Sequence, residues 1–219
     1  MQIRIYQIKN NDKKFVSYQT ALELGGINAA DYRLAYSGDI VVEDMETALE
    51  RIYAICNNKQ PLGYNGHSLS VSDIIEVREW NSYFYVDDVG FQKLDGFKAE
   101  LTDIDSFVRI LICEPDRHPY VSEIPPENLR VMQDIVGGTL ETLPYDDKII
   151  AWCNDEGLID NLPPNRIVSG NIIHGSFFFS TLRQKGCEQT MGSLDPEQAD
   201  KLTERFFWNA SLANMREGF

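Results

Sequence analysis

The chain has 219 residues, of which 43% are hydrophobic, enough to bury one sizeable core or two small ones. Its 34 acidic and 20 basic residues give a formal net charge of −14, which disfavours generic nucleic-acid binding because phosphate backbones are repelled at long range. No apolar run approaches the roughly 18–20 residues of a membrane span, and the first residues have no signal-like apolar core. We therefore expect a cytoplasmic protein.

The first half of the chain predicts a small α+β unit. Apolar residues at i, i+4, i+7, i+8 and i+11 from Met45 to Cys56 indicate one helix, with Asp44 placed as its N-cap. Stretches rich in alternating, aromatic or β-branched residues indicate strands. The predicted strands cover residues 2–8, 13–18, 32–37, 73–79 and 82–89.

The second half predicts another such unit. It begins with a buried strand over 107–113, and Pro125-Pro126 then opens a helix that Gly137-Gly138 closes. The apolar face of that helix is expected to contain Leu129, Met132, Ile135 and Val136. Two strands over 139–143 and 148–153 should form a hairpin, and residues 170–179 a strand pair or one strand broken at Gly175. A last helix should run from Pro196 to about Met215, with Asp195 as its cap.

These elements predict an α+β protein built from two small mixed α/β units. Each unit should be a short, largely antiparallel sheet with one or two packed helices. The first unit is expected over residues 1–97 and the second over 107–219. Residues 98–106 are expected to form an acidic connector between them.

One stretch has the composition of a hydrolase site. His67, Ser68, Ser70, Ser72 and Asp73 lie within eight residues, between Gly66 and Asp73. A nucleophilic serine needs a base within hydrogen-bond reach, and the G-x-S-x-G turn that often presents it is missing. Adjacent side chains on a strand also face opposite sides. We therefore favour a structural role, in which a serine caps a turn and Asp73 binds loop amides, and we predict no catalytic residue. A ligand or partner site at His67, Ser68, Ser70 and Asp73 stays open.

Metal and cofactor sites receive little support from the sequence. The run Asn154–Gly157 lacks the D-x-D-x-D-G alternation of calcium loops, and His118 and His174 lack zinc-ligand spacing. Neither a G-x-x-x-x-G-K-[ST] nor a G-x-G-x-x-G motif occurs. We predict no metal, no cofactor and no disulfide. The four cysteines are scattered through the chain at positions 56, 113, 153 and 187, with no C-x-x-C pair.

Two resemblances add to this reading. The first half contains Tyr36-Ser37-Gly38, the Leu49–Tyr53 helix, the run Gly66–Ile75, Tyr85-Val86-Asp87 and Gly90-Phe91. On these motifs, residues 32–97 resemble the YodL-like domain family. The second half contains Ile135–Glu141, Asn154–Gly157, Leu162–Asn165, Gly170–Gly175 and the capped last helix. On these, residues 107–207 resemble a phage and mobile-element family catalogued as a domain of unknown function. Position 155 departs mildly from the second family, which more often has Glu there. Both resemblances imply a mobile-element setting near antirestriction genes, and neither implies a reaction.

Acidic residues cluster over 87–105 and 141–160. Together with the implied setting, they favour a non-enzymatic accessory protein that inhibits a host defence nuclease of CRISPR or restriction type. The partner would be a basic protein surface, such as the nucleic-acid channel of the nuclease. The candidate partner-binding residues are Asp87, Asp88, Asp146, Asp147, Asp155 and Glu156. The alternative is an enzyme or small-ligand-binding protein with a site near His67 and Asp87.

Overall fold

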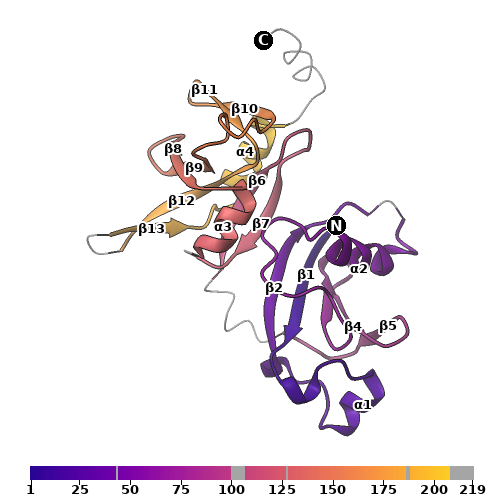
Figure 1. Ribbon diagram of the computed structural model, residues 1–219. Coiled ribbons are helices and arrows are strands. Elements are labelled where there is room, and N and C mark those ends of the chain that lie inside the picture. Colours follow the sequence, from indigo (N-terminus) through magenta and orange to yellow (C-terminus); the bar gives the residue numbers. More distant parts are fainter. Residues whose placement is uncertain (43, 100–106, 127, 186–187, 208–219) are drawn as a thin grey trace. The chain divides into compact units, whose positions relative to one another are not determined.

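The computed structural model describes residues 1–42, 44–99, 107–126, 128–185 and 188–207. These residues form a mixed α/β structure in which four α-helices accompany antiparallel strands, as the sequence predicts. The chain divides into two compact units, unit 1 (Met1–Ser106) and unit 2 (Phe107–Phe219), shown in Figure 1. Most of the predicted connector, residues 100–106, lies outside the described part of the chain.

Unit 1 contains five strands that pair in the order β5-β4-β3-β1-β2. β1 lies between β2 and β3, and its register with β2 shifts between Ile5 and Tyr6. A short turn separates β4 from β5, with Val86 opposite Phe91. The strands are β1 (Gln2–Ile8), β2 (Tyr32–Asp39), β3 (Ile74–Val77), β4 (Ser82–Val86) and β5 (Phe91–Leu94).

Helix α2 (Ala48–Asn58) supplies the helical side of the unit 1 core. Its buried Ile52 and Cys56 pack in one cluster with strand residues that include Ile3, Ile5 and Ile75. Of the apolar positions that predict the helix, Ile52 and Cys56 are buried and Leu49 packs against the cluster, whereas Tyr53 is exposed and Met45 lies exposed before the helix. Burial of each such aliphatic side chain contributes about 1.5–3 kcal/mol to folding.

Some predictions for unit 1 are wrong. Residues 13–18 do not form a strand; they connect a 3-10 turn, η1 (Asn11–Lys13), to helix α1 (Tyr18–Glu23), for which no helix is predicted. Helix α2 begins three residues later than its apolar pattern, because Asp44 accepts hydrogen bonds from the Glu46 amide and the Thr47 hydroxyl in the preceding turn. Two further short turns, η2 (Ala29–Asp31) and η3 (Arg78–Trp80), precede β2 and β4.

In unit 2 the strands pair in the order β7-β6-β12-β9-β8, and β13 also pairs with β12. β10 and β11 pair only with each other. The first five are β6 (Val108–Cys113), β7 (Tyr120–Ile124), β8 (Leu140–Pro144), β9 (Ile149–Asn154) and β10 (Pro164–Val168). The others are β11 (Asn171–His174), β12 (Phe177–Lys185) and β13 (Glu188–Gly192).

The end of the first unit 2 helix and the start of the second are as the sequence predicts, but the first helix begins at Leu129, later than the predicted opening at Pro125-Pro126. Helix α3 (Leu129–Val136) is capped by the Asn128 side chain and ends at Gly137, whose φ of 76° is the left-handed conformation that glycine adopts without strain. Helix α4 (Pro196–Arg205) has a complete capping box between Asp195 and Gln198. Phe177 and Phe179 of β12 lie in one buried cluster with α4 residues.

Several boundaries in unit 2 differ from the predictions. Residues 170–179 form two strands divided at Gly175, as one of the two predictions has it. The two strands have different partners, however: β11 pairs with β10, and β12 pairs with β6 and β9. β7, β10 and β13 occur where no strand is predicted. Leu129, predicted on the buried face of α3, is exposed. α4 ends at Arg205, and the predicted continuation over 208–215 lies outside the described residues.

Candidate functional site

The loop from Gly66 to Asp73 is fixed to unit 1 by a buried side chain of β1, Gln7. The Gln7 amide nitrogen donates to the His67 carbonyl (2.7 Å), and its oxygen accepts from the His67 backbone nitrogen (3.2 Å). Arg33 of β2 donates to the same Gln7 oxygen (3.1 Å) and to the Asn65 carbonyl (2.7 Å). The loop passes so close that a Cβ at Gly66 would lie 2.1 Å from Gln7 Oε1, so any other residue there requires Gln7 or the loop to move.

Asp73 is the buried charge of this loop. Its carboxylate accepts hydrogen bonds from the backbone amides of Ser70 (3.0 Å) and Ile8 (3.3 Å) and from the Gln7 side chain (3.4 Å). Burial raises the pKa of Asp73 to about 6, although the Ser70 amide and the nearby His67 ring act to lower it. The prediction that Asp73 binds loop amides is confirmed.

The serines of the loop do not form a nucleophile–base pair with His67. Nδ1 of His67 lies 2.7 Å from the Ser68 carbonyl oxygen and 3.1 Å from the Gln7 amide nitrogen, so within the described part of the chain its ring contacts the loop and β1 and no serine hydroxyl. The Ser70 hydroxyl donates to that same oxygen (2.8 Å), and the Ser72 hydroxyl accepts from the Val16 amide (2.9 Å). The predicted helical turn capped by a serine is therefore replaced by contacts with Val16 and the loop itself. The His67 side chain is 40% exposed and lies 3.8 Å from Asp73 Oδ2, and Ser68 next to it is exposed as well.

Asp87 organises backbone as well. Its Oδ1 accepts from the Tyr18 amide (2.8 Å) at the start of α1 and from the Asp88 amide (2.9 Å). Partial burial acts to raise the pKa of Asp87, but these hydrogen bonds outweigh it and the pKa is lowered. Asp88, next to it, is exposed. Within the described ranges no hydrogen bond or ion pair joins His67 to Asp87. The geometry brings His67 to Asp73 instead.

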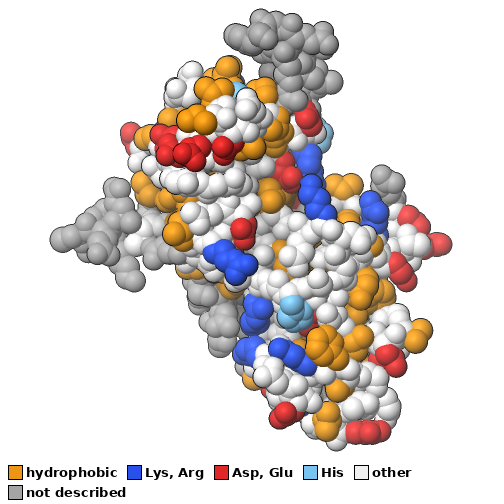
Figure 2. All heavy atoms as spheres, viewed as in Figure 1, with side chains coloured by type: hydrophobic (Ala, Val, Ile, Leu, Met, Phe, Trp, Pro, Cys, Tyr) orange, Lys and Arg blue, Asp and Glu red, His pale blue; other side chains and the backbone are white. Residues whose placement is uncertain are grey.

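The other four candidate acids are exposed at opposite ends of the β8–β9 hairpin of unit 2. Asp146 and Asp147 lie in its turn, where Asp146 accepts from the Lys148 and Ile149 amides (both 2.8 Å). Asp155 and Glu156 follow β9, at the end where Leu140 lies opposite Asn154. The paired length separates the two groups by about 15 Å. Figure 2 shows acidic side chains, in red, gathered over β8 and β9.

Two apolar side chains accompany these acids, and the sequence analysis misses them. Leu158 and Ile159 are 69% and 76% exposed in the turn that follows Glu156. The turn is closed by the Asp160 amide, which donates to the Glu156 carbonyl (2.8 Å), and Asp160 is itself exposed. An acidic and apolar surface therefore follows β9. In the sequence this surface could have been recognised from Leu158-Ile159, an apolar pair that lies between acidic residues and outside any predicted strand or helix.

The histidines and cysteines have other contacts. The His118 ring stacks on Phe207 with centroids 4.0 Å apart, and His174 Nδ1 lies 3.0 Å from the Leu162 carbonyl oxygen. In the part of the chain that the structure describes, no group of three or more His, Cys, Asp or Glu side chains could hold a metal ion. Cys56, Cys113 and Cys153 are free and buried, and burial raises their pKa to about 12, 12 and 11. Of the described helices, none is long and apolar enough to cross a membrane.

Two family models match the chain. The YodL-like domain matches residues 2–97, and a domain of unknown function (DUF3846) matches residues 108–207. Both resemblances are thereby confirmed, and the YodL-like match extends over β1, which supplies Gln7. A search of curated proteins and a search of solved structures find no match.

Proposed function

Since the two halves of the chain match the YodL-like domain and DUF3846 families, we propose that it is a non-enzymatic accessory protein of a phage or mobile element. It acts by protein–protein contact and inhibits a host defence nuclease of CRISPR or restriction type. Its partner is a basic surface, and the nucleic-acid channel of such a nuclease has that charge. The resemblances support the proposed setting, and the surface of unit 2 supports the proposed mode of contact.

The observation that carries the proposal is the acidic and apolar surface after β9. No lysine or arginine occurs in the sequence between Ile149 and Asn165, and Asp155, Glu156 and Asp160 are exposed there. The exposed Leu158 and Ile159 lie among these acids in the same turn. Protein interfaces commonly combine apolar contact with a polar rim, so the apolar pair supplies buried area while the acids select a basic partner.

The candidate acids are not equivalent. The carboxylates of Asp87 and Asp146 already accept backbone hydrogen bonds that hold α1 and the hairpin turn. We assign the partner contact chiefly to Asp147, Asp155 and Glu156, with Asp160 added. Reversal of these charges therefore tests binding without removing a hydrogen bond that the fold uses.

The finer architecture belongs to the same proposal. Each unit is a short, largely antiparallel sheet with one or two packed helices, and each acts as a separate module. The support is the division into two compact units between Ser106 and Phe107, which falls in the gap between the two family matches, 2–97 and 108–207. Expression of residues 107–219 alone tests it: a dispersed amide spectrum that superimposes on the full chain supports the modules, and a collapsed spectrum rejects them.

A second candidate function is a small-ligand or enzymatic site at His67. One observation favours it: a half-exposed imidazole lies 3.8 Å from a fully buried carboxylate, Asp73. Substitution of His67 or Ser70 by Ala leaves the acidic surface intact. Loss of activity in these variants, with retention after charge reversal, would establish the second function over the first.

The proposed function is tested by DNA cleavage with purified host nucleases, one CRISPR complex and one restriction enzyme. The parent protein should slow cleavage by at least one of them. The triple variant Asp147→Lys, Asp155→Lys, Glu156→Lys should lose that inhibition. A matched control reverses three exposed acids of unit 1, Asp12, Glu23 and Glu50, and should retain it. Equal inhibition by the two triple variants would reject the assigned surface.

A further inference from the structure

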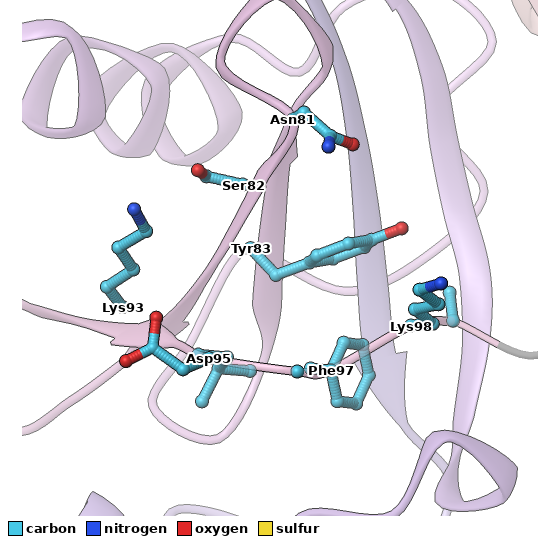
Figure 3. Close-up of a pocket in the computed structure, with 10 residues that line it drawn as sticks. Asn81, Ser82, Tyr83, Lys93, Asp95, Phe97 and Lys98 are labelled. Atoms are coloured by element: carbon cyan, nitrogen blue, oxygen red, sulfur yellow. The ribbon is translucent and has the colours of Figure 1, made fainter.

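Unit 1 contains a cavity that neither the acidic surface nor the His67 loop uses. Its volume is about 440 Å³, within the roughly 300–1,000 Å³ typical of small-molecule sites. Figure 3 shows it beside β4, β5 and the chain that follows them. The lining residues come from 81–83 and 93–99, and they include Asn81, Tyr83, Lys93, Asp95, Phe97 and Lys98.

The aromatic wall of the cavity is held rigidly. The Tyr83 and Phe97 rings meet edge to face, with centroids 5.2 Å apart. Tyr83 also contacts Tyr6 (6.3 Å), and Phe97 contacts Tyr32 (6.1 Å), so each ring has a second aromatic neighbour behind it. Leu94, opposite Tyr83 in the β4–β5 pairing, adds apolar surface. A wall fixed in this way loses little conformational entropy when a ring docks on it.

The charge of the cavity is opposite to that of the chain. Lys93 and Lys98 are exposed and line it, and Figure 3 shows the Tyr83 and Phe97 rings lying between them. Across the residues that the structure describes, neither lysine forms an ion pair with an acid. Asp95 is the one acid of the lining. Among the described residues the lining therefore has two lysines without an acidic partner beside an aromatic wall, which makes a local anion site in a chain of net charge −14.

We propose that this cavity binds a small, flat aromatic anion. The aromatic ring packs against Tyr83 and Phe97, and its carboxylate, sulfonate or phosphate group is held by Lys93 or Lys98. This site lies in unit 1 and does not depend on the protein contacts proposed for unit 2.

The test uses 8-anilinonaphthalene-1-sulfonate, an aromatic anion whose fluorescence reports an apolar environment, and its neutral analogue N-phenyl-1-naphthylamine. The sulfonate should bind the full chain saturably at one site. Amide shift changes should map to 81–83 and 93–99. The double variant Lys93→Gln, Lys98→Gln should weaken binding by about two- to fivefold, the range expected when one exposed ion pair is lost. A matched double variant, Lys9→Gln, Lys59→Gln, should bind as the parent does.

Four results would overturn the proposal. They are no saturable binding of the sulfonate, shift changes outside 81–83 and 93–99, unchanged affinity in the Lys93 and Lys98 variant, and equal affinity for the neutral analogue. Both lysines are exposed, so their substitution should leave the fold intact, and the amide spectrum of each variant checks this. A second variant, Phe97→Leu, removes one ring and should weaken both probes together.

Discussion

Replacement of Asp73 by Asn removes the buried carboxylate that holds the Gly66–Asp73 loop to β1. Burial raises the pKa of Asp73 from 3.8 to about 6, so the folded state binds this proton more tightly than the unfolded state does. The stability that the proton contributes is fully present below pH 3.8 and is lost as the pH rises through about 6. At 1.36 kcal/mol per pKa unit, the loss amounts to about 3 kcal/mol.

Between acid and neutral pH the parent should therefore lose about 3 kcal/mol of its free energy of unfolding that Asp73→Asn does not lose. The variant thus gains stability relative to the parent at pH 7 and above. Asn also turns an amino group towards a backbone amide, at a cost of about 1–3 kcal/mol that does not vary with pH. Urea denaturation at a series of pH values, followed through the amide signals of β1 and β3, measures unit 1 directly.

The control is Glu50→Gln, which removes an exposed carboxylate on α2. Its stability curve should run parallel to that of the parent, because the exposed group is solvated in both states. A parent-to-Asp73→Asn difference that is constant with pH would refute the reasoning. A 13C titration of the Asp73 carboxyl provides the second readout, with a midpoint near pH 6 expected.

Three further predictions concern the fold. Gly66→Ala should destabilise unit 1 by about 1–3 kcal/mol in a thermal melt, since its methyl group overlaps the Gln7 amide; an unchanged melt would show that the loop can withdraw. Asp195→Ala should lower the free energy of unfolding of unit 2 by about 1 kcal/mol through loss of the capping box, and Asp195→Asn should lose less. Limited proteolysis should cut first between the units or in the loop after β6, and first cuts inside α2 or β9 would contradict the division into units. The expected early sites are residues 95–106 and 114–119.

The elements that the sequence predicts are those whose pattern reflects burial. β1, α2 and α3 have periodic apolar positions and β6 is a continuous apolar run, and α3 and α4 also have start or stop signals that side chains and glycine supply locally. α1 has a local cap, Ser17, but is six residues long and buries one residue, Ala21, and β10 has no such signal. α1 depends on Asp87, 69 residues away, to hold the Tyr18 amide, and β10 depends on its pairing with β11. Such elements are set by tertiary contacts that a local pattern does not encode.

The residues of the Gly66–Asp73 loop show the same difference between local contacts, which the sequence predicts, and long-range contacts, which it does not. The role of Asp73 can be predicted because one of its partners, the Ser70 amide, is three residues away. Gln7 and Arg33 cannot be predicted from the loop, because they reach it from β1 and β2 across 60 and 32 residues. Asp87 illustrates the opposite error: a cluster of acids in the sequence indicates a charged surface, whereas this carboxylate binds backbone amides.

The central claim is that the acidic surface of unit 2 meets a basic partner, and the most direct measurement is the association rate constant with a purified CRISPR or restriction nuclease free of nucleic acid. Three acid-to-lysine changes at Asp147, Asp155 and Glu156 add two charges each and take the net charge from −14 to −8. Electrostatic steering accelerates association by about 10- to 1,000-fold and falls steeply with salt. The account predicts fast, salt-sensitive association of the parent and association at least about tenfold slower in the triple variant at low salt. Equal rates, or rates of the parent that do not respond to salt, would contradict it.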